Sequence, residues 1–283
     1  MKEKEQMHNP DFSVMSTLYL KEELGEEFFS ELSGAGFDAM GAAIYPGHFR
    51  NCPEDIAVLK KLCRKYRIKV ESVHCDFASL DGKRQREAES FIVNDLRLTS
   101  ELGARHLVVH SAIFADPGNI IRDEKGRLYP GFSVFRDLED EKSGMAGRIK
   151  DGLARYADKA RKLGVVIALE TDLKMNARLP DLISDADLEA CGLCFDAGHA
   201  ELEMGAVKAA ELLGPRIVCT HLHDNDGKDD LHLPPFKGVI DWTGVLAALV
   251  KAGYKGYYTF ECLKGTMSDI VAARERLSEI IDL

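Results

Sequence analysis

The sequence of 283 residues lacks the features of a membrane-spanning, secreted or disulfide-stapled protein. Its longest apolar runs, such as residues 165–169, are far too short to cross a bilayer. The N-terminal stretch MKEKEQMHNPDF is charged and has no apolar segment, so it predicts no secretory signal. Of the seven cysteines, only Cys191 and Cys194 have CxxC spacing, and they lie in an apolar run, where a cysteine is usually a small buried hydrophobe. An odd cysteine count without a signal predicts a cytoplasmic protein with reduced thiols.

The sequence is also short of positive charge. It has 37 Lys and Arg against 47 Asp and Glu, and its formal net charge is −10. A protein that binds nucleic acid has to neutralise phosphates with basic side chains, so this charge makes a nucleic-acid partner unlikely, although a local basic patch is compatible with it. With 45% hydrophobic and 30% charged residues, the composition is that of a globular protein.

Short runs rich in β-branched residues alternate with longer amphipathic stretches. We expect strands at 12–18, 39–45, 68–74, 106–111, 165–170, 193–196, 217–223 and 256–261. Helical patterns cover 21–32, 53–66, 84–102, 145–163, 179–186, 206–213, 242–252 and 267–281. Eight strands that are each followed by a helix predict one α/β domain over residues 1–283, a single (β/α)₈ TIM barrel. A doubly wound sheet is the alternative, but it rarely needs eight such units in a row.

The connection after the fourth strand is unusually long. Residues 112–144 combine Pro, Gly and mixed charge, and loops of this length tend to be lids or binding loops. A disordered surface insertion is the other interpretation. The aromatic residues Tyr129, Phe132 and Phe135 favour an ordered lid. Residues 1–10 are predicted to be a flexible N-terminus.

Ionisable residues follow mainly apolar strands at the ends that face the mouth of a barrel. They are His74, His110, Glu170, Asp196, His221, His223 and Glu261. One such residue alone is more often a structural histidine or half of a salt bridge. Together they indicate a metal site, because burying several carboxylates is very costly unless they are paired or bind a cation. Carboxylates with an imidazole suit Mn²⁺, Mg²⁺, Co²⁺ or Zn²⁺.

Two other kinds of site are excluded by residue spacing. The cysteines do not occupy strand-end positions in the pattern of a structural zinc site. A calcium loop with Gly227 at its sixth position would begin at Leu222 and end at Leu233, and neither side chain can bind calcium. We therefore interpret residues 224–229 as a solvated turn.

The segments ALETD, CFDAGH, HLHDNDGKDDLHLPP and FEC lie in this order on the last four predicted strands and the loops that follow them. In order and spacing they resemble the xylose isomerase-like TIM barrels, a superfamily of sugar-phosphate isomerases and epimerases, ketose 3-epimerases, inosose dehydratases and endonuclease IV. The resemblance covers nearly the whole chain. It implies a metal-dependent sugar isomerase or epimerase of carbohydrate metabolism that abstracts a proton next to a carbonyl and proceeds through a metal-stabilised enediolate. A small sugar or cyclitol is the implied partner, and barrels of this superfamily often pair as homo-oligomers.

The ketose 3-epimerase pattern implies one divalent metal ion, commonly manganese. The implied ligands are Glu170, Asp196, His223 and Glu261. Glu170 and Glu261 would also act as the catalytic acid and base. Substrate-binding roles fall to His199, His232, His74, His110 and His221, with the choice between His221 and His223 as ligand left open.

The sequence departs from the epimerase pattern before and after its two prolines. The epimerases have an arginine where this chain has His232, and an acid where it has Lys237. Asp230 and His232 resemble the Asp-x-His pair that binds an extra zinc in endonuclease IV, so a second metal and a zinc phosphodiesterase remain an alternative. An inosose-type dehydratase or lyase and a non-catalytic sugar-binding barrel are two more.

Overall fold

The computed structural model describes residues 11–20, 22–45, 47–75, 85–110, 113–122, 128–134, 145–171, 179–184 and 189–281, with the backbone alone at 85–90, 113–122, 128–134 and 145–146. The flexible N-terminus expected at 1–10 lies outside these residues. Within them, no helix has both the length and the apolar content to span a membrane.

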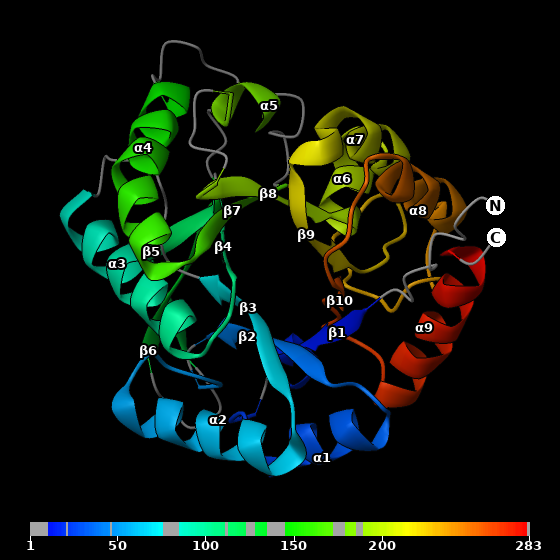
Figure 1. The fold of residues 1–283 in the computed structure, drawn as a ribbon, viewed down its shortest axis with the longest axis horizontal. Helices are drawn as coiled ribbons and strands as arrows, with labels where there is room; N and C mark the ends of the chain where they lie inside the picture. The colour runs from blue at the N-terminus through cyan, green and yellow to red at the C-terminus, as the bar shows by residue number, and fades with distance from the viewer. Residues whose placement is uncertain are drawn as a thin grey trace, which may run out of the picture.

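Eight parallel strands close into a barrel in the order β1-β10-β9-β8-β7-β4-β3-β2 (Figure 1). Their bounds are β1 Phe12–Met15, β2 Ala39–Ile44, β3 Lys69–Cys75, β4 His106–Val109, β7 Val166–Glu170, β8 Cys191–Asp196, β9 Ile217–Leu222 and β10 Tyr258–Phe260. The strands are apolar and almost entirely buried, as parallel strands covered on both faces have to be. The predicted TIM barrel is therefore confirmed.

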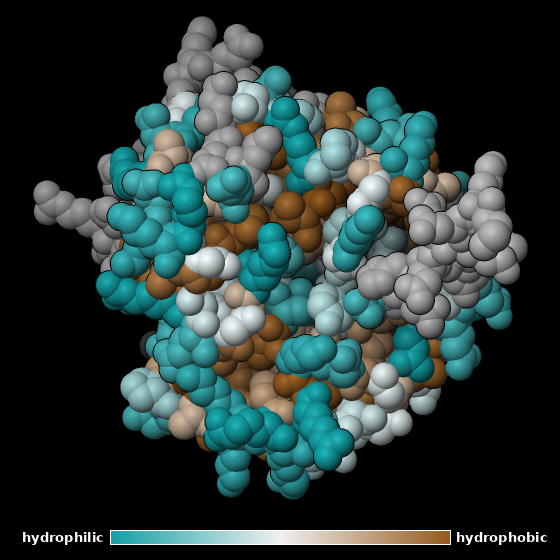
Figure 2. Space-filling view, viewed as in Figure 1, coloured by the Kyte–Doolittle hydropathy of each residue, from teal (hydrophilic) through white to brown (hydrophobic). Residues whose placement is uncertain are grey.

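The helices surround the ring of strands (Figure 1). They are α1 Glu26–Gly34, α2 Pro53–Tyr66, α3 Gln85–Glu101, α4 Met145–Leu163, α5 Leu179–Leu182, α6 Ala197–Glu203, α7 Ala206–Leu213, α8 Trp242–Lys251 and α9 Met267–Ile281, with 3₁₀ turns at Ser16–Tyr19 and Gly214–Arg216. Hydrophilic residues make up most of the periphery of the face in Figure 2, and hydrophobic residues show closer to its middle.

The structure differs from the expected elements at several ends. The first strand stops at Met15 and continues as a 3₁₀ turn, and the first helix begins at Glu26 rather than at residue 21. Helix α6 was not expected at all. It begins because the carboxylate of Asp196 accepts a hydrogen bond from the backbone N–H of His199, which caps the helix directly at the end of β8.

The long connection after β4 contains an antiparallel hairpin of β5 (Ile113–Arg122) and β6 (Leu128–Val134). Its backbone is therefore ordered into strands where the sequence indicated a loop. The register shifts between Asp116 and Ile120, so the hairpin has a bulge at the Pro-Gly sequence that the sequence analysis took for a loop signal. That the segment acts as a lid stays a prediction, because residues 123–127 and 135–144, which include Phe135, lie outside the described part.

Candidate active site

Glu170 is the residue around which the predicted side chains gather. It ends β7 and is fully buried. The Nδ1 atom of His221 lies 2.6 Å from its Oε1, while Nε2 of His74 and Nδ1 of His110 each lie 3.1 Å from its Oε2. Burial would raise the pKa of Glu170, but the three imidazoles beside it outweigh burial and hold that pKa well below its usual value. Glu170 is thus an anion at neutral pH.

Four residues, three at or near the ends of β7, β8 and β9 and one directly after β10, form what we call the central set: Glu170, Asp196, His221 and Glu261. One donor atom from each lies within 4.8 Å of the others, and all four are at most 5% exposed. Nδ1 of His221 is 3.1 Å from Glu261 Oε2 and 3.9 Å from Asp196 Oδ2. Three buried carboxylates with one histidine carry an excess of negative charge, and a divalent cation compensates such a set. The donors therefore fit a metal ion.

The imidazole of His221 is oriented by these carboxylates. Burial would lower the pKa of His221, but Glu261 and Glu170 together raise it well above its usual value. They face Nδ1, while Nε2 on the opposite edge of the ring is buried and has no hydrogen-bond partner among the described residues. The ring thus presents one nitrogen to the central set and the other to the barrel interior.

His223, which the resemblance implied as the metal ligand, lies just outside the central set. Its Nε2 is 2.9 Å from Asp196 Oδ1 and 3.0 Å from Asp196 Oδ2. The ring packs on the backbone of α6, where a Cβ at Gly198 would lie 1.9 Å from its Cε1 atom. The close approach requires glycine at 198 and places His223 as a neighbour of Asp196.

A second group, the rim set, consists of His199, His223, Asp230 and His232, whose donor atoms also lie within 4.8 Å of one another. Oδ2 of Asp230 is 3.0 Å from His232 Nε2 and 3.3 Å from His199 Nε2. The rings of His223 and His232 stack at 3.8 Å. Burial would raise the pKa of the Asp230 carboxyl, but His199 and His232 hold it far below its usual range. The rim set touches the central set where His223 meets Asp196.

The loop that carries Asp230 and His232 is anchored by Asp224. Its carboxylate is fully buried and accepts hydrogen bonds from the side-chain N–H of Trp242 and from backbone N–H groups of Asn225, Phe236 and Ile240. The interpretation of 224–229 as a solvated turn is therefore wrong for its first two residues and holds for Asp226 and Asp229, which are exposed. The aspartate that begins the turn is a buried acceptor because the loop folds back over it.

A third group, His74, His110 and Glu170, shares Glu170 with the central set. The predicted site residues thus converge from β3, β7, β8 and β9, from the residues directly after β4, β9 and β10, from α6 and from the loop after β9. The sequence analysis missed Asp224 and a buried carboxylate at Glu71. Both lie in polar surroundings that only the folded chain assembles, although Glu71 within an apolar strand is itself a signal.

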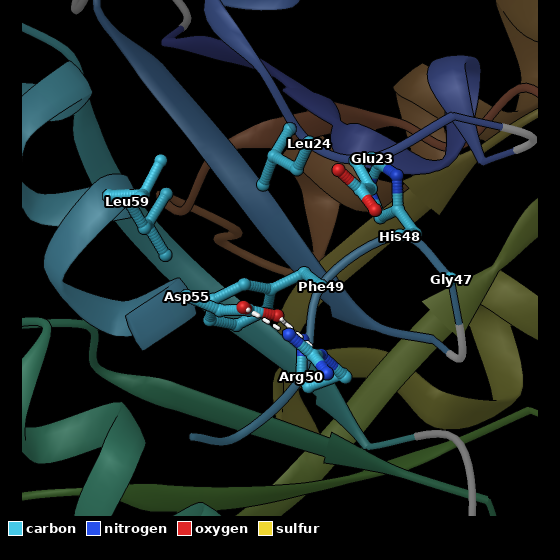
Figure 3. A pocket seen from close by; sticks show the side chains of 9 residues that line it. Glu23, Leu24, Gly47, His48, Phe49, Arg50, Asp55 and Leu59 are labelled. Atoms are coloured by element: carbon cyan, nitrogen blue, oxygen red, sulfur yellow. Dashed lines mark hydrogen bonds and ion pairs between the residues drawn. The ribbon is translucent and has the colours of Figure 1, made fainter. Parts of the chain in front are cut away.

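A small pocket of about 150 Å³ is lined by the segment before α1, the loop after β2 and α2 (Figure 3). Its lining includes Leu24, His48 and Leu59, and the guanidinium of Arg50 is paired with the carboxylate of Asp55. It contains none of the predicted site residues.

Comparisons with known proteins agree with this architecture. Residues 29–280 match the model of a family described as xylose isomerase-like TIM barrel. The uncharacterized protein y4fM of Sinorhizobium fredii is 32% identical over 64% of this chain, and the match spans about half, 54%, of y4fM. Inosose dehydratase of Lacticaseibacillus casei is 25% identical, with 84% of both chains covered. A solved structure of a D-tagatose 3-epimerase-like protein superposes with a TM-score of 0.76 at 24% identity, covering 96% of this chain and 97% of that one. At this identity, the superposition shows the fold alone.

Proposed function

The chain belongs to the xylose isomerase-like TIM barrel family, and on that premise we propose that it is a divalent-metal-dependent sugar isomerase or epimerase. The observation that carries the proposal is the central set, in which two glutamates from strands that are not neighbours lie around one cluster of donor atoms. The similar proteins include an inosose dehydratase and a D-tagatose 3-epimerase-like protein, and these names support a small sugar or cyclitol as the substrate.

We assign the four ligand positions to Glu170, Asp196, His221 and Glu261. The assignment of His221 rather than His223 rests on Nδ1 of His221, which faces two of the carboxylates at 2.6 and 3.1 Å. His223 touches only Asp196 of this set within 3.1 Å. Manganese remains our expectation for the metal, with magnesium, cobalt and zinc compatible with the same donors.

Proton transfer falls to the two glutamates. Glu170 and Glu261 enter the site from β7 and from the end of β10, which are separated by β8 and β9, so each can reach one face of the same substrate carbon. Their pKa values both lie below the usual one, so both are ionised at neutral pH; as the lowered pKa also weakens them as bases, the substrate C–H has to be acidified by more than this loss. A bound divalent cation would polarise the substrate carbonyl and so acidify the neighbouring C–H.

The histidines around the set are placed to hold a polyhydroxylated substrate. His199 and His232 stand on the rim, while His74 and His110 flank Glu170. Imidazoles donate to or accept from hydroxyl groups, so several in one cavity suit a sugar. We assign these four residues to substrate binding.

Isotope exchange tests the proposal. Wild type with Mn²⁺ and a panel of ketoses and inososes in D₂O should incorporate deuterium at the carbon beside the carbonyl. Glu170→Gln and Glu261→Gln should each lower the exchange rate by about 10²-fold or more, as loss of a general base does. Glu279→Gln, on the surface of α9, is the matched control and should exchange like wild type. Absence of exchange with every substrate would overturn the proposal, and exchange with loss of water would assign a dehydratase.

A second candidate, a multi-metal phosphoesterase, is favoured by one observation. The third group, the central set and the rim set adjoin one another through Glu170 and through the contact of His223 with Asp196. Neighbouring metal ions can activate a water and stabilise a leaving oxygen. Elemental analysis of zinc-loaded protein decides between the two candidate functions. About three zinc ions per chain, together with hydrolysis of bis(p-nitrophenyl) phosphate, would establish the phosphoesterase. One ion without hydrolysis would exclude it.

A further inference from the structure

Glu71 is a buried carboxylate that the proposed chemistry does not use. It lies on β3, inside the barrel. One of its oxygens, Oε1, accepts hydrogen bonds from the hydroxyls of Ser13, Ser72 and Thr259 at 3.0, 2.9 and 2.9 Å. Every hydrogen bond that the described residues make to this carboxylate ends on Oε1. The second oxygen, Oε2, is therefore available to another donor.

His221, on β9 across the barrel from β3, offers that donor. If Nδ1 binds a metal ion, its lone pair points to the ion and the ring proton has to sit on Nε2. Metal-bound imidazoles almost always donate this second N–H to a carboxylate, a backbone carbonyl or a water molecule. Nε2 of His221 is buried, and none of the described residues accepts from it. A partner of the right chemistry is thus required inside the barrel.

The contacts of Thr259 make Glu71 the candidate for this partner. Thr259, which bonds to Glu71, is the register partner of His221 on the neighbouring strand β10. Burial raises the pKa of Glu71, and the hydrogen bonds from the three hydroxyls act against that rise. The three hydroxyls hold Oε1 of this carboxylate in place.

We infer that Glu71 is a positioning residue for the metal centre. Its carboxylate accepts a hydrogen bond from the Nε2–H of His221, directly or through one water molecule. The contact fixes the tautomer that leaves Nδ1 free to bind the ion, and it makes the imidazole a stronger ligand. Ser13, Ser72 and Thr259 orient the carboxylate for this task. The inference rests on the proposed metal site, but it concerns a residue that touches neither metal nor substrate.

Glu71→Gln is the sharpest variant because it keeps the size of the side chain. Its amide can still accept from the hydroxyls through oxygen, and its NH₂ group then faces Nε2 and favours the wrong tautomer. Metal affinity should fall by about 10- to 100-fold, the usual cost of losing such a partner. The affinity is measured by calorimetry with Mn²⁺ in competition with a chelator.

The matched control is Asp95→Asn, which also replaces a buried carboxylate by an amide. Asp95 is held by the side chains of Asn51 and Cys75, away from the central set. It should change thermal stability but leave the metal affinity as in wild type. Circular dichroism of both variants establishes that they fold.

Nuclear magnetic resonance of protein with ¹⁵N-labelled histidine and bound Zn²⁺ provides the second readout. Wild type should show one exchange-protected Nε2–H signal, which is absent in His221→Gln, and Glu71→Gln should shift or lose it. Equal metal affinity and an unchanged signal in folded Glu71→Gln would overturn the role of Glu71 while leaving the metal site intact. Failure of wild type to bind metal would overturn both.

Discussion

Replacing Asp224 by Asn should loosen the loop that carries Asp230 and His232. Four N–H groups converge on this buried carboxylate: Asn225 and Ile240 donate to Oδ1 at 3.0 and 3.2 Å, while Phe236 and Trp242 each donate to Oδ2 at 2.9 Å. The same loop holds His232 and Phe236 at φ values of 46° and 69°, which non-glycine residues adopt only at a cost. The carboxylate therefore offsets this backbone strain.

The magnitude follows from the number of bonds lost. Asparagine keeps one acceptor oxygen and turns its NH₂ group toward two of the donors, so two charge-assisted hydrogen bonds disappear at about 1.5–3 kcal/mol each. Burying a neutral amide instead of a charge returns part of this loss. We expect a net loss of about 3 kcal/mol in the free energy of unfolding, which corresponds to a decrease of about 6–12 °C in Tm.

Denaturant unfolding and calorimetry measure the effect, with Asp226→Asn as the control. Asp226 is exposed and, among the described residues, accepts from the backbone N–H groups of Lys228 and Asp229, so its substitution should cost less than about 1 kcal/mol. If Asp224→Asn unfolds like wild type and like the control, the anchoring role assigned to Asp224 is refuted.

Two more predictions concern Gly198, which lies beside the candidate site, and His106, at the start of β4. Gly198→Ala should displace His223 and lower the free energy of unfolding by about 1–3 kcal/mol. The control is Gly147→Ala, whose added Cβ meets no atom within 4 Å and should be neutral or slightly stabilising. Equal stability of the two variants would contradict the close contact between Gly198 and His223. Burial and, to a smaller extent, the charge of Arg105 lower the pKa of His106 to about 4. As pH falls, His106 is therefore protonated in the unfolded chain before it is protonated in the folded one. The free energy of unfolding should decrease by about 3 kcal/mol between about pH 6.5 and about pH 4. Unfolding of His106→Gln across this range should show a flatter pH dependence than wild type.

The fold could be predicted because its signals are local. Runs of β-branched residues alternate with amphipathic stretches, and glycines such as Gly103 and Gly253 end helices at positive φ as glycine readily does. Two features escaped this reasoning. The hairpin β5–β6 depends on pairing across a Pro-Gly bulge, and α6 is too short to show a helical period. In each case a contact that forms only on folding decided the structure.

The candidate site could be predicted as a set but not in its inner order. The strand-end rule brought Glu170, Asp196 and Glu261 together. It could not rank His221 against His223, because residues two apart on a strand share a face and the shift in register beside β8 sets their depth. Asp224 was misjudged for a related reason, since a polar residue in a turn is buried only if a distant segment returns to cover it.

Locating the metal tests the central claim most directly. Crystals grown with Mn²⁺ and measured at the manganese absorption edge should show one anomalous peak, bounded by carboxylate oxygens of Glu170, Asp196 and Glu261 and by Nδ1 of His221. Each of these four atoms should lie at direct coordination distance from the peak. A peak among His199, Asp230 and His232 with none at the central set would contradict the account.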